Sequence, residues 1–414
     1  MDEQASVGWF VARRLGQAVI RYPGLALCAV TCSAAVLRWG IPGLSVLLAV
    51  VVGFVIVWTM GDSELFARVI SLRSASKRNL DSFSRKIENQ LKPLGVKPRD
   101  FQVVEFRAGY DVEIRGNRKS ILSAADSIAE QVEAISWNQR PTEHLGITTL
   151  RIRMFDVLSA PVGEFSKDSF DESRGVRFAV DEDGNDVWLD ESVVSLLLAG
   201  TPGSGKSAIS AFVGLGAARE QKVLAIDCKA GLEFAPFRFS PTVDVVHVMT
   251  EVVAGLQEVV LEMETRFVLL ETYGMRKVPE GDENWEPIWV VVDELQALFE
   301  PADKSLRSAA DEARLLLQDL VARGRAAGVV VIVATQHANA ALMSSAFRDL
   351  LRVRIGFHQS TSAAWKMVLG EFDGHVSDVP HGCPGLALMR VDKSNVVRLR
   401  TYEMSDASLE ELAT

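Results

Sequence analysis

The stretch "LLLAGTPGSGKSAIS", Leu196 to Ser210, decides the fold class of this chain. Its first four residues, Leu196 to Ala199, are apolar and suit a buried strand, whereas the residues after Ser207 suit a helix. Between them the sequence fits the pattern G-x-x-x-x-G-K-[ST], which binds phosphate in this strand–loop–helix context. The alternative is a glycine-rich turn with an accidental lysine. We therefore expect an α/β domain that holds a phosphate.

The loop in this stretch predicts a site for ATP and Mg²⁺. Its glycines let backbone N–H groups turn inward around the phosphates, and the following helix adds a partial positive charge. We expect Lys206 to reach the β and γ phosphates and Ser207 to hold Mg²⁺. The residues expected to bind the nucleotide are Gly200, Thr201, Pro202, Gly203, Ser204, Gly205, Lys206 and Ser207.

A second apolar run, "IWVVVDELQALFE" from Ile288 to Glu300, has the pattern of a Walker B strand. It ends in an acidic pair, and charged residues at the end of a buried strand are seldom there for packing. We expect Asp293 to bind Mg²⁺ through its water shell and Glu294 to polarise the attacking water. The alternative is a strand that simply ends in a surface turn.

A helix and a further buried strand are expected after the Walker B run. The helix covers Asp311 to Ala326 and ends in "ARGRAAG", and the strand covers Val329 to Ala334. Gln336 follows that strand, where a polar side chain can sense the γ-phosphate or the attacking water. Arg323 and Arg325 are either solvated arginines at a helix end or a finger that enters a neighbouring subunit's ATP site.

Composition places the chain among ordinary globular proteins that carry a membrane segment. It has 414 residues, of which 48% are hydrophobic and 24% are charged. The net charge of −10 argues against a uniformly basic coat for nucleic acid, but not against a local basic channel. The cysteines show neither metal-type spacing nor a disulfide framework, so a reducing compartment is expected outside the membrane; they are Cys28, Cys32, Cys228 and Cys383.

The N-terminal region predicts a transmembrane helical hairpin. Ile41 to Met60 has 20 residues without a charge, which is enough to cross a bilayer. Gly24 to Leu37 is shorter and spans only with Ala18 to Tyr22, while Arg21 and Arg38 reach the interfaces. Basic residues flank the pair on both sides, which predicts a multi-pass membrane protein with both ends in the cytoplasm and the turn outside. A cleaved signal peptide and a single span are the alternatives.

Between the membrane segment and the phosphate loop the pattern predicts a small α/β domain. Phe101 to Gly116 alternates like two strands around Ala108-Gly109, Lys119 to Ile135 has a helical pattern, and Thr148 to Val157 suits a strand. A hairpin around Asp183-Gly184 follows. The expected domains are a membrane anchor (1–61), an α/β adaptor (62–160), a P-loop ATPase motor (161–395) and a short C-terminal tail (396–414).

Several segments together resemble the motor domain of FtsK/SpoIIIE DNA translocases. They are the phosphate loop, the Walker B run, "IDCKAGLE" (Ile226 to Glu233), "EMETR" (Glu262 to Arg266), "RAAGVVVIVATQ" (Arg325 to Gln336) and "HGCPGLALMR" (His381 to Arg390). The likeness runs from about Val176 to Arg390. Two positions depart from the family pattern, because Cys228 replaces the usual proline and Val330 stands where histidine is usual.

The resemblance implies a RecA-like parallel sheet and a ring, usually hexameric, with ATP at the subunit interfaces. It also favours an interface finger in the "ARGRAAG" segment without choosing between Arg323 and Arg325. The arrangement of the whole chain resembles the short FtsK-like transfer (Tra) proteins of actinomycete conjugative plasmids and integrative elements. This implies a membrane-anchored, ATP-driven pump for double-stranded DNA. Its expected partners are the duplex, further copies of itself, the cytoplasmic membrane and other transfer proteins.

Three other functions remain open at this point. They are a chromosome or plasmid segregation motor at the septum, a type VII secretion-like ATPase that exports protein, and a single-strand coupling protein. Basic residues in the loops after the core strands are candidates to grip duplex phosphates, with solvated surface charge as the alternative. These candidates are Lys304, Arg307, Arg348 and Arg352.

Overall fold

The computed structural model describes residues 79–140, 146–171, 173–229, 231–279, 281–339, 342–371 and 379–413. It divides into two compact units, Met1–Arg99 and Asp100–Thr414. In the described part of the first unit, residues 79–91 are helical. The expected transmembrane hairpin, within residues 18–60, lies outside the described residues. Within the described ranges, the search for a helix of sufficient length and hydropathy to cross a bilayer found none.

The second unit begins with a four-stranded antiparallel sheet in the order β1-β2-β4-β3. Its elements are β1 (Phe101–Phe106), β2 (Gly109–Arg115), α5 (Arg118–Gln131), β3 (Ser136–Arg140) and β4 (Ile147–Arg153). The expected strand pair, helix and later strand are thus confirmed. The sequence does not predict β3, because "SWNQR" is polar. In the structure its side chains alternate only between exposed and half-buried.

An 11-stranded sheet forms the rest of the unit, in the order β10-β9-β11-β12-β8-β13-β14-β15-β6-β5, with β7 paired to β6. From β10 to β13 neighbouring strands run parallel, and the others pair antiparallel. The strands are β5 (Phe170–Asp171), β6 (Gly175–Asp181), β7 (Asp186–Leu189), β8 (Ser195–Ala199), β9 (Val223–Ile226), β10 (Val243–Val246), β11 (Ile288–Val292), β12 (Val329–Thr335), β13 (Val353–Gly356), β14 (Leu386–Val391) and β15 (Val397–Thr401). The expected parallel sheet is confirmed.

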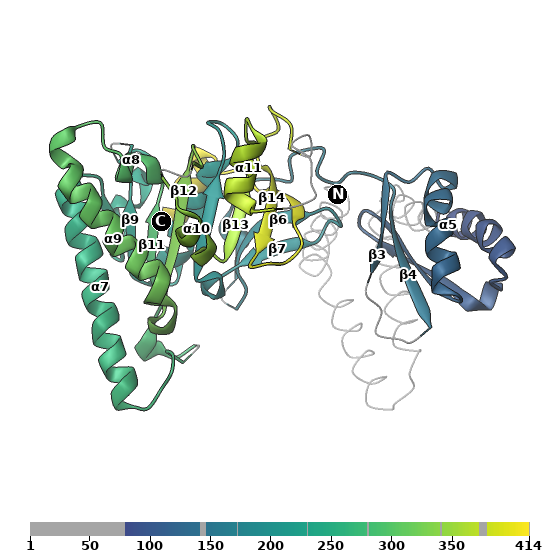
Figure 1. Ribbon diagram of the computed structural model, residues 1–414, viewed down its shortest axis with the longest axis horizontal. Coiled ribbons are helices and arrows are strands. Elements are labelled where there is room, and N and C mark those ends of the chain that lie inside the picture. The colour runs from purple at the N-terminus through teal and green to yellow at the C-terminus, as the bar shows by residue number, and fades with distance from the viewer. Residues whose placement is uncertain are drawn as a thin grey trace, which may run out of the picture. The chain divides into compact units, whose positions relative to one another are not determined.

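Helices cover both faces of this sheet (Figure 1). They are α6 (Ser210–Ala218), α7 (Met249–Thr272), α8 (Leu295–Phe299), α9 (Arg307–Arg323), α10 (Ser345–Leu350), α11 (Ser362–Leu369) and α12 (Asp406–Ala413). A Cβ at Gly216 of α6 would touch the side chain of Val223, and one at Gly255 of α7 would touch that of Leu224. Because consecutive strand residues point to opposite faces, α6 and α7 lie on opposite sides of the sheet.

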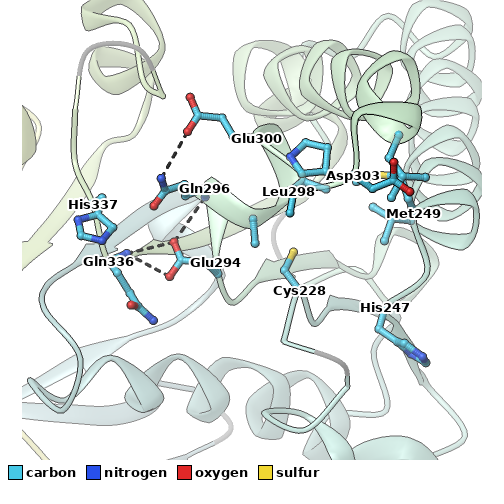
Figure 2. Close-up of a pocket in the computed structure, with 15 residues that line it drawn as sticks. Cys228, His247, Met249, Glu294, Gln296, Leu298, Glu300, Asp303, Gln336 and His337 are labelled. Carbon is cyan, nitrogen blue, oxygen red and sulfur yellow. Dashed lines mark hydrogen bonds between the residues drawn. The ribbon is translucent and has the colours of Figure 1, made fainter.

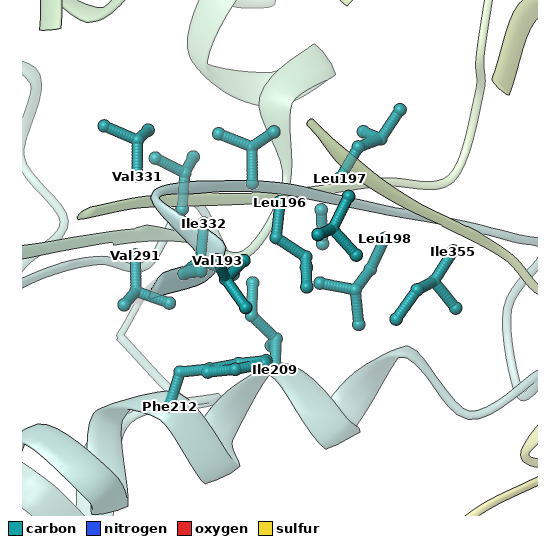
Figure 3. Packing of buried hydrophobic residues seen from close by; sticks show 14 of the residues in the cluster. Val193, Leu196, Leu197, Leu198, Ile209, Phe212, Val291, Val331, Ile332 and Ile355 are labelled. Carbon is teal, nitrogen blue, oxygen red and sulfur yellow. The ribbon is translucent and has the colours of Figure 1, made fainter. Parts of the chain in front are cut away.

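The central strands are buried on both faces, which explains their unbroken apolar sequences. Every residue of β8, β11 and β12 is buried. Figure 3 shows Phe212 of α6 packed beneath Leu196 and Leu198 of β8 and their neighbours. Each such leucine stabilises the fold by roughly 1.5–3 kcal/mol through burial of its side chain. The strand ends therefore form a rigid frame for the loops that follow them.

The segment expected to be a short C-terminal tail takes part in the sheet. β15 pairs with both β14 and β6, so it connects two parts of the motor that are far apart in the sequence. Leu412 of α12 is buried beside Gly214 of α6. The sheet thus extends beyond residue 395, where the motor domain was expected to end.

Candidate nucleotide site

The phosphate loop is fastened to the ends of three other strands. The Gly200 N–H donates to the Thr335 carbonyl at the end of β12 (3.1 Å), and the Thr201 N–H donates to the His358 carbonyl just after β13 (3.1 Å). Further along the loop, the Ser204 carbonyl accepts the N–H of Gly385, which precedes β14 (2.9 Å). These hydrogen bonds to the sheet therefore fix the conformation of the loop.

Close packing explains two of the loop's glycines. A Cβ at Gly200 would lie 2.5 Å from Ser204 Oγ and 2.7 Å from Phe357 Cβ. A Cβ at Gly205 would lie 2.7 Å from the Gly385 nitrogen, and the Gly205 φ of +114° is itself unfavourable for other residues. The chain after Gly205 forms one 3-10 turn, Lys206–Ile209, before α6 begins. The helix expected after the loop is thus present.

A cavity of about 290 Å³ opens beside this loop. It is lined by Pro202, Gly203, Gly205, Lys206, Ser207, Ile209, Lys229, Glu233, Asp293 and Gln336. The cavity thus gathers residues from the ends of four strands, including Lys206, Ser207 and Asp293; of the residues expected to bind the nucleotide, Gly200, Thr201 and Ser204 do not line it. Sequence reasoning missed Lys229 and Glu233. Both lie in the "IDCKAGLE" segment, which carried a family resemblance but no assigned role.

Lys206 lies in the phosphate loop with its ammonium group largely removed from water. Its Nζ donates to the Thr201 carbonyl of the same loop (2.8 Å). Burial is the main cause that lowers the pKa of Lys206 to about 8; the negative charge of Glu294 opposes this change, and the positive charge of Lys229 adds to it. A buried cation gains more from an added phosphate than an exposed one does, because the surrounding dielectric is low.

Asp293 follows β11 and is 2% exposed. Its Oδ1 accepts the N–H of Cys228 (2.7 Å). Its Oδ2 accepts no well-formed hydrogen bond, although Lys229 Nζ lies 3.2 Å away. Burial raises the pKa of Asp293 to about 6. A buried carboxylate oxygen with this little compensation, lining one cavity with the Ser207 hydroxyl, fits a hard divalent cation.

Mg²⁺ needs few protein ligands, because it keeps waters and binds substrate phosphates through its other positions. In the described ranges no group of three or more His, Cys, Asp or Glu side chains is arranged to hold a metal ion. A site with one carboxylate and one hydroxyl is therefore the kind that uses nucleotide phosphates as additional ligands, and the residues present fit Mg²⁺ in that manner.

Glu294 does not line this cavity but lines a larger one (Figure 2). The backbone N–H of Gln336 donates to both carboxylate oxygens of Glu294 (3.1 Å and 3.2 Å). The backbone N–H of Gln296 also donates to Oε1 (3.4 Å). The larger cavity, of about 540 Å³, extends from Glu294 to Glu300 and Asp303. Gln336 lines both cavities. The acidic and amide side chains expected near the attacking water thus lie at the ends of adjacent strands.

The two candidate finger arginines have different surroundings. Arg323 ends α9 and forms ion pairs with Asp319 and Glu264. Arg325 lies in the following 3-10 turn, Gly324–Ala327, and is exposed. Its side chain has no hydrogen bond or ion pair with the residues that the structure describes.

The candidate duplex-gripping residues also differ. Arg348 pairs with Asp349 (2.7 Å), and Arg352 pairs with Asp392 (2.8 Å). Lys304 and Arg307, at the start of α9, are exposed. An arginine that already pairs with a carboxylate of its own chain binds a phosphate less strongly. Lys304 and Arg307 are therefore more available to DNA than Arg348 and Arg352.

Known proteins are similar to the part of this chain that contains the nucleotide site. Residues 165–343 match the model of the FtsK/SpoIIIE family. DNA translocase FtsK of Lactococcus lactis subsp. cremoris is 28% identical over an alignment of 245 residues that covers 53% of this chain and 30% of the relative. DNA translocase FtsK of Listeria monocytogenes is 25% identical over an alignment of 367 residues that covers 80% of this chain and 46% of the relative. The chain thus spans less than half the length of these relatives.

Among solved structures, the pCW3 conjugation coupling protein TcpA, in its monomer form with ATPγS, has a similar fold. The match has a TM-score of 0.55 at 17% identity, and covers 79% of this chain and 96% of TcpA. The family match, the fold and the phosphate loop on β8 agree. Residues 165–343 of this chain therefore resemble the ATPase domain of the FtsK/SpoIIIE family.

Proposed function

We propose that this chain binds Mg²⁺·ATP, hydrolyses it, and uses the free energy to move double-stranded DNA. The observation that carries the proposal is the shared cavity of about 290 Å³, in which Lys206, Ser207, Asp293 and Gln336 converge. A phosphate-binding lysine, a hydroxyl, a buried carboxylate and a polar strand-end side chain are the parts that phosphoryl transfer to water needs.

In this proposal each residue has one role. Ser207 and Asp293 offer oxygen ligands to Mg²⁺, which would neutralise charge on the β and γ phosphates. Lys206 turns from the Thr201 carbonyl to the phosphates. Glu294 orients the attacking water and takes its proton, and Gln336 holds that water at the terminal phosphate.

We assign the finger to Arg325 and a structural role to Arg323. An arginine finger needs an exposed guanidinium that is free to enter a neighbouring subunit, and Arg325 meets this requirement. The Arg323 guanidinium is committed to Asp319 and Glu264. The proposal therefore includes a ring, with six copies expected from the family resemblance, in which each site is completed by the next subunit.

Double-stranded DNA is the proposed cargo because the family relatives are named DNA translocases and because a duplex suits a ring. A duplex offers one phosphate charge about every 1.7 Å along its axis, which a few cations per subunit can hold. Lys304 and Arg307 lie at the start of α9 and are exposed. Phe347 of α10, beside the candidate Arg348, is buried and cannot stack on bases of a single strand.

The proposed setting is conjugative transfer, with the chain anchored in the bacterial cell membrane and the motor domain in the cytoplasm. The apolar residues 18–60 support the anchor, and the likeness in fold to a conjugation coupling protein supports the setting. Other transfer proteins are then expected partners. Segregation at the septum uses the same chemistry and is the alternative, and a type VII secretion-like ATPase is a further one.

The experiment that tests the proposal measures ATP hydrolysis by the full-length chain in detergent with different polymers. Linear duplex DNA should stimulate turnover, and the Lys206→Ala variant should show no activity with any polymer. Stimulation by single-stranded DNA alone would favour a coupling protein that handles single strands. Stimulation by a secreted protein alone would favour the type VII alternative, and either outcome would contradict duplex translocation.

A further inference from the structure

Lys229 connects the end of β9 to the end of β11. Its Nζ lies 3.2 Å from Asp293 Oδ2, the buried oxygen that accepts no well-formed hydrogen bond. The same side chain lines the nucleotide cavity together with Lys206 and Ser207. An ammonium group and the proposed Mg²⁺ would therefore share one carboxylate oxygen.

The backbone from Asp227 to Lys229 is held in place, while the side chain of Lys229 has room to turn. The Lys229 N–H donates to Asp227 Oδ1 (2.9 Å), and the preceding Cys228 N–H donates to Asp293 Oδ1 (2.7 Å). Asp227 also accepts the N–H of Phe234, which closes the loop (3.2 Å). In contrast, the Lys229 side chain is 39% exposed, compared with 1% for the side chain of Asp293. The ammonium can thus move without rearranging the loop.

We propose that Lys229 exchanges partners during the ATPase cycle. It neutralises Asp293 until Mg²⁺ binds there, and it then turns to the terminal phosphate of ATP. Two cations repel each other at one carboxylate oxygen, and the terminal phosphate adds negative charge to the same cavity, so both steps follow from Coulomb's law. The flexible four-carbon stem of lysine permits the movement. This inference rests on the proposed function of the site, and it makes Lys229 a residue that distinguishes ATP from ADP.

Equilibrium binding of ADP and of ATPγS to the full-length chain, over a titration of Mg²⁺, tests this exchange. Lys229→Gln removes the competing cation. The Mg²⁺ concentration at half-maximal ADP binding should therefore fall by about threefold or more. At saturating Mg²⁺ the variant should bind ATPγS about tenfold more weakly, because one charge-assisted hydrogen bond is lost. Its ADP affinity should stay within about twofold of the parent value, because ADP has no terminal phosphate for Lys229 to contact.

Two further variants serve as controls. Lys229→Arg keeps a cation and should keep the preference for ATPγS over ADP. Lys222→Gln removes a lysine outside the cavity that pairs with Glu258, and it should behave like the parent chain in both titrations. Thermal unfolding of each variant checks that it is folded; if Lys229→Gln is not, Lys229→Met serves in its place.

The outcomes separate this inference from the proposed function. If the parent chain binds neither nucleotide, the proposed function fails. If the parent chain binds nucleotide with a dependence on Mg²⁺ but Lys229→Gln leaves the Mg²⁺ midpoint unchanged, the competition at Asp293 is contradicted. If Lys229→Gln weakens ADP and ATPγS equally, Lys229 does not contact the terminal phosphate. Either of the last two results overturns the exchange and leaves the nucleotide site intact.

Discussion

The Gln336 N–H donates to the carboxylate of Glu294 from 3.1 Å and 3.2 Å, so the end of β12 holds the acidic side chain that follows β11. This contact joins the expected base to the strand end that carries the expected γ-phosphate sensor. Gln336 lines both the nucleotide cavity and the larger cavity that reaches the start of α9, whereas Glu294 lines the larger one. A movement of Gln336 when the terminal phosphate binds or leaves would therefore also move Glu294, because the hydrogen bonds connect the segment after β12 to the segment after β11.

The Glu294→Gln variant should bind ATP normally and hydrolyse it at least about 100-fold more slowly, because an amide cannot take the proton of the attacking water. Single-turnover hydrolysis measured beside ATPγS affinity separates the two effects. Glu300→Gln is the matched control, since Glu300 lines the same larger cavity and bonds to Gln296 (3.4 Å). It should keep near-normal turnover. Normal turnover by Glu294→Gln would remove Glu294 from the role of base.

The Arg325→Ala variant should lose about 1,000-fold or more in ATP turnover while still binding ATP, because a finger acts on the charge of the transition state. Arg323→Ala should lose far less, since exposed ion pairs of this kind contribute about 1 kcal/mol or below to stability. ATP hydrolysis by each purified variant, at equal subunit concentration, makes the comparison. Equal losses in both variants would contradict the assignment of Arg325.

Mixing subunits tests whether the finger acts between neighbours. Arg325→Ala chains supply intact phosphate loops, and Lys206→Ala chains supply intact fingers. Mixed rings should therefore regain part of the activity that neither variant has alone. Rings shown to contain both chains, but without activity at any ratio, would contradict a finger in trans.

Asp293→Asn should stabilise the chain at neutral pH while destroying Mg²⁺-dependent nucleotide binding. Burial raises the pKa of Asp293 from 3.8 to about 6, so the folded chain keeps a proton that the unfolded chain has lost between these two values. The free energy of unfolding therefore falls as the pH rises from about 4 to about 6, and the cost is complete above that range. Asparagine removes this cost, which is on the order of 2–3 kcal/mol at neutral pH.

Urea unfolding in Mg²⁺-free buffer between about pH 4.5 and about pH 7.5 measures the effect on stability over most of the expected titration from about 4 to about 6. The advantage of Asp293→Asn should grow with pH up to about pH 6 and stay constant above it. Asp244→Asn is the control, because Asp244 is exposed on β10 and its replacement should change little. An advantage that does not vary with pH would show that Asp293 carries no buried charge.

The Gly385→Ala variant should weaken the hydrogen bond between the Gly385 N–H and the Ser204 carbonyl of the phosphate loop. A Cβ at Gly385 would lie 3.0 Å from the Thr401 carbonyl oxygen, and the Gly385 N–H is the one that supports Ser204. Gly382→Ala is a close match, since the two φ angles are +79° and +82° but a Cβ at Gly382 meets no atom within 4 Å. Both variants should bear left-handed strain of about 1–2 kcal/mol. Only Gly385→Ala should also weaken ATPγS binding, and equal binding by both variants would contradict a supporting role for Gly385.

The parallel sheet and the main nucleotide-binding segments could be predicted because local signals specify them. β8, β11 and β12 are continuous apolar runs that end in polar residues with recognisable chemistry, and their carboxyl ends meet at one edge of the sheet. The spacing of the phosphate loop then places Lys206 and Ser207. These features depend on residues that are close together in the sequence.

Contacts between distant segments could not be predicted in the same way. Gly385 supports a loop about 180 residues earlier, and no local pattern announces a hydrogen bond between two backbone groups. Lys229 reaches Asp293 because β9 and β11 are neighbours in the sheet, and that order depends on the packing of the whole domain. β15 resembles an exposed strand in a terminal segment until its pairing with β6 is known.

Displacement of a third strand from a DNA triplex tests the central claim, translocation along duplex DNA, most directly. The full-length chain in detergent, supplied with Mg²⁺ and ATP, is added to a linear duplex that carries a labelled third strand at one end. Translocation should release the strand at a rate that depends on ATP, and Lys206→Ala and Glu294→Gln chains should release none. Hydrolysis of ATP that is stimulated by the duplex, but with no release of the third strand, would show that the chain does not move along duplex DNA.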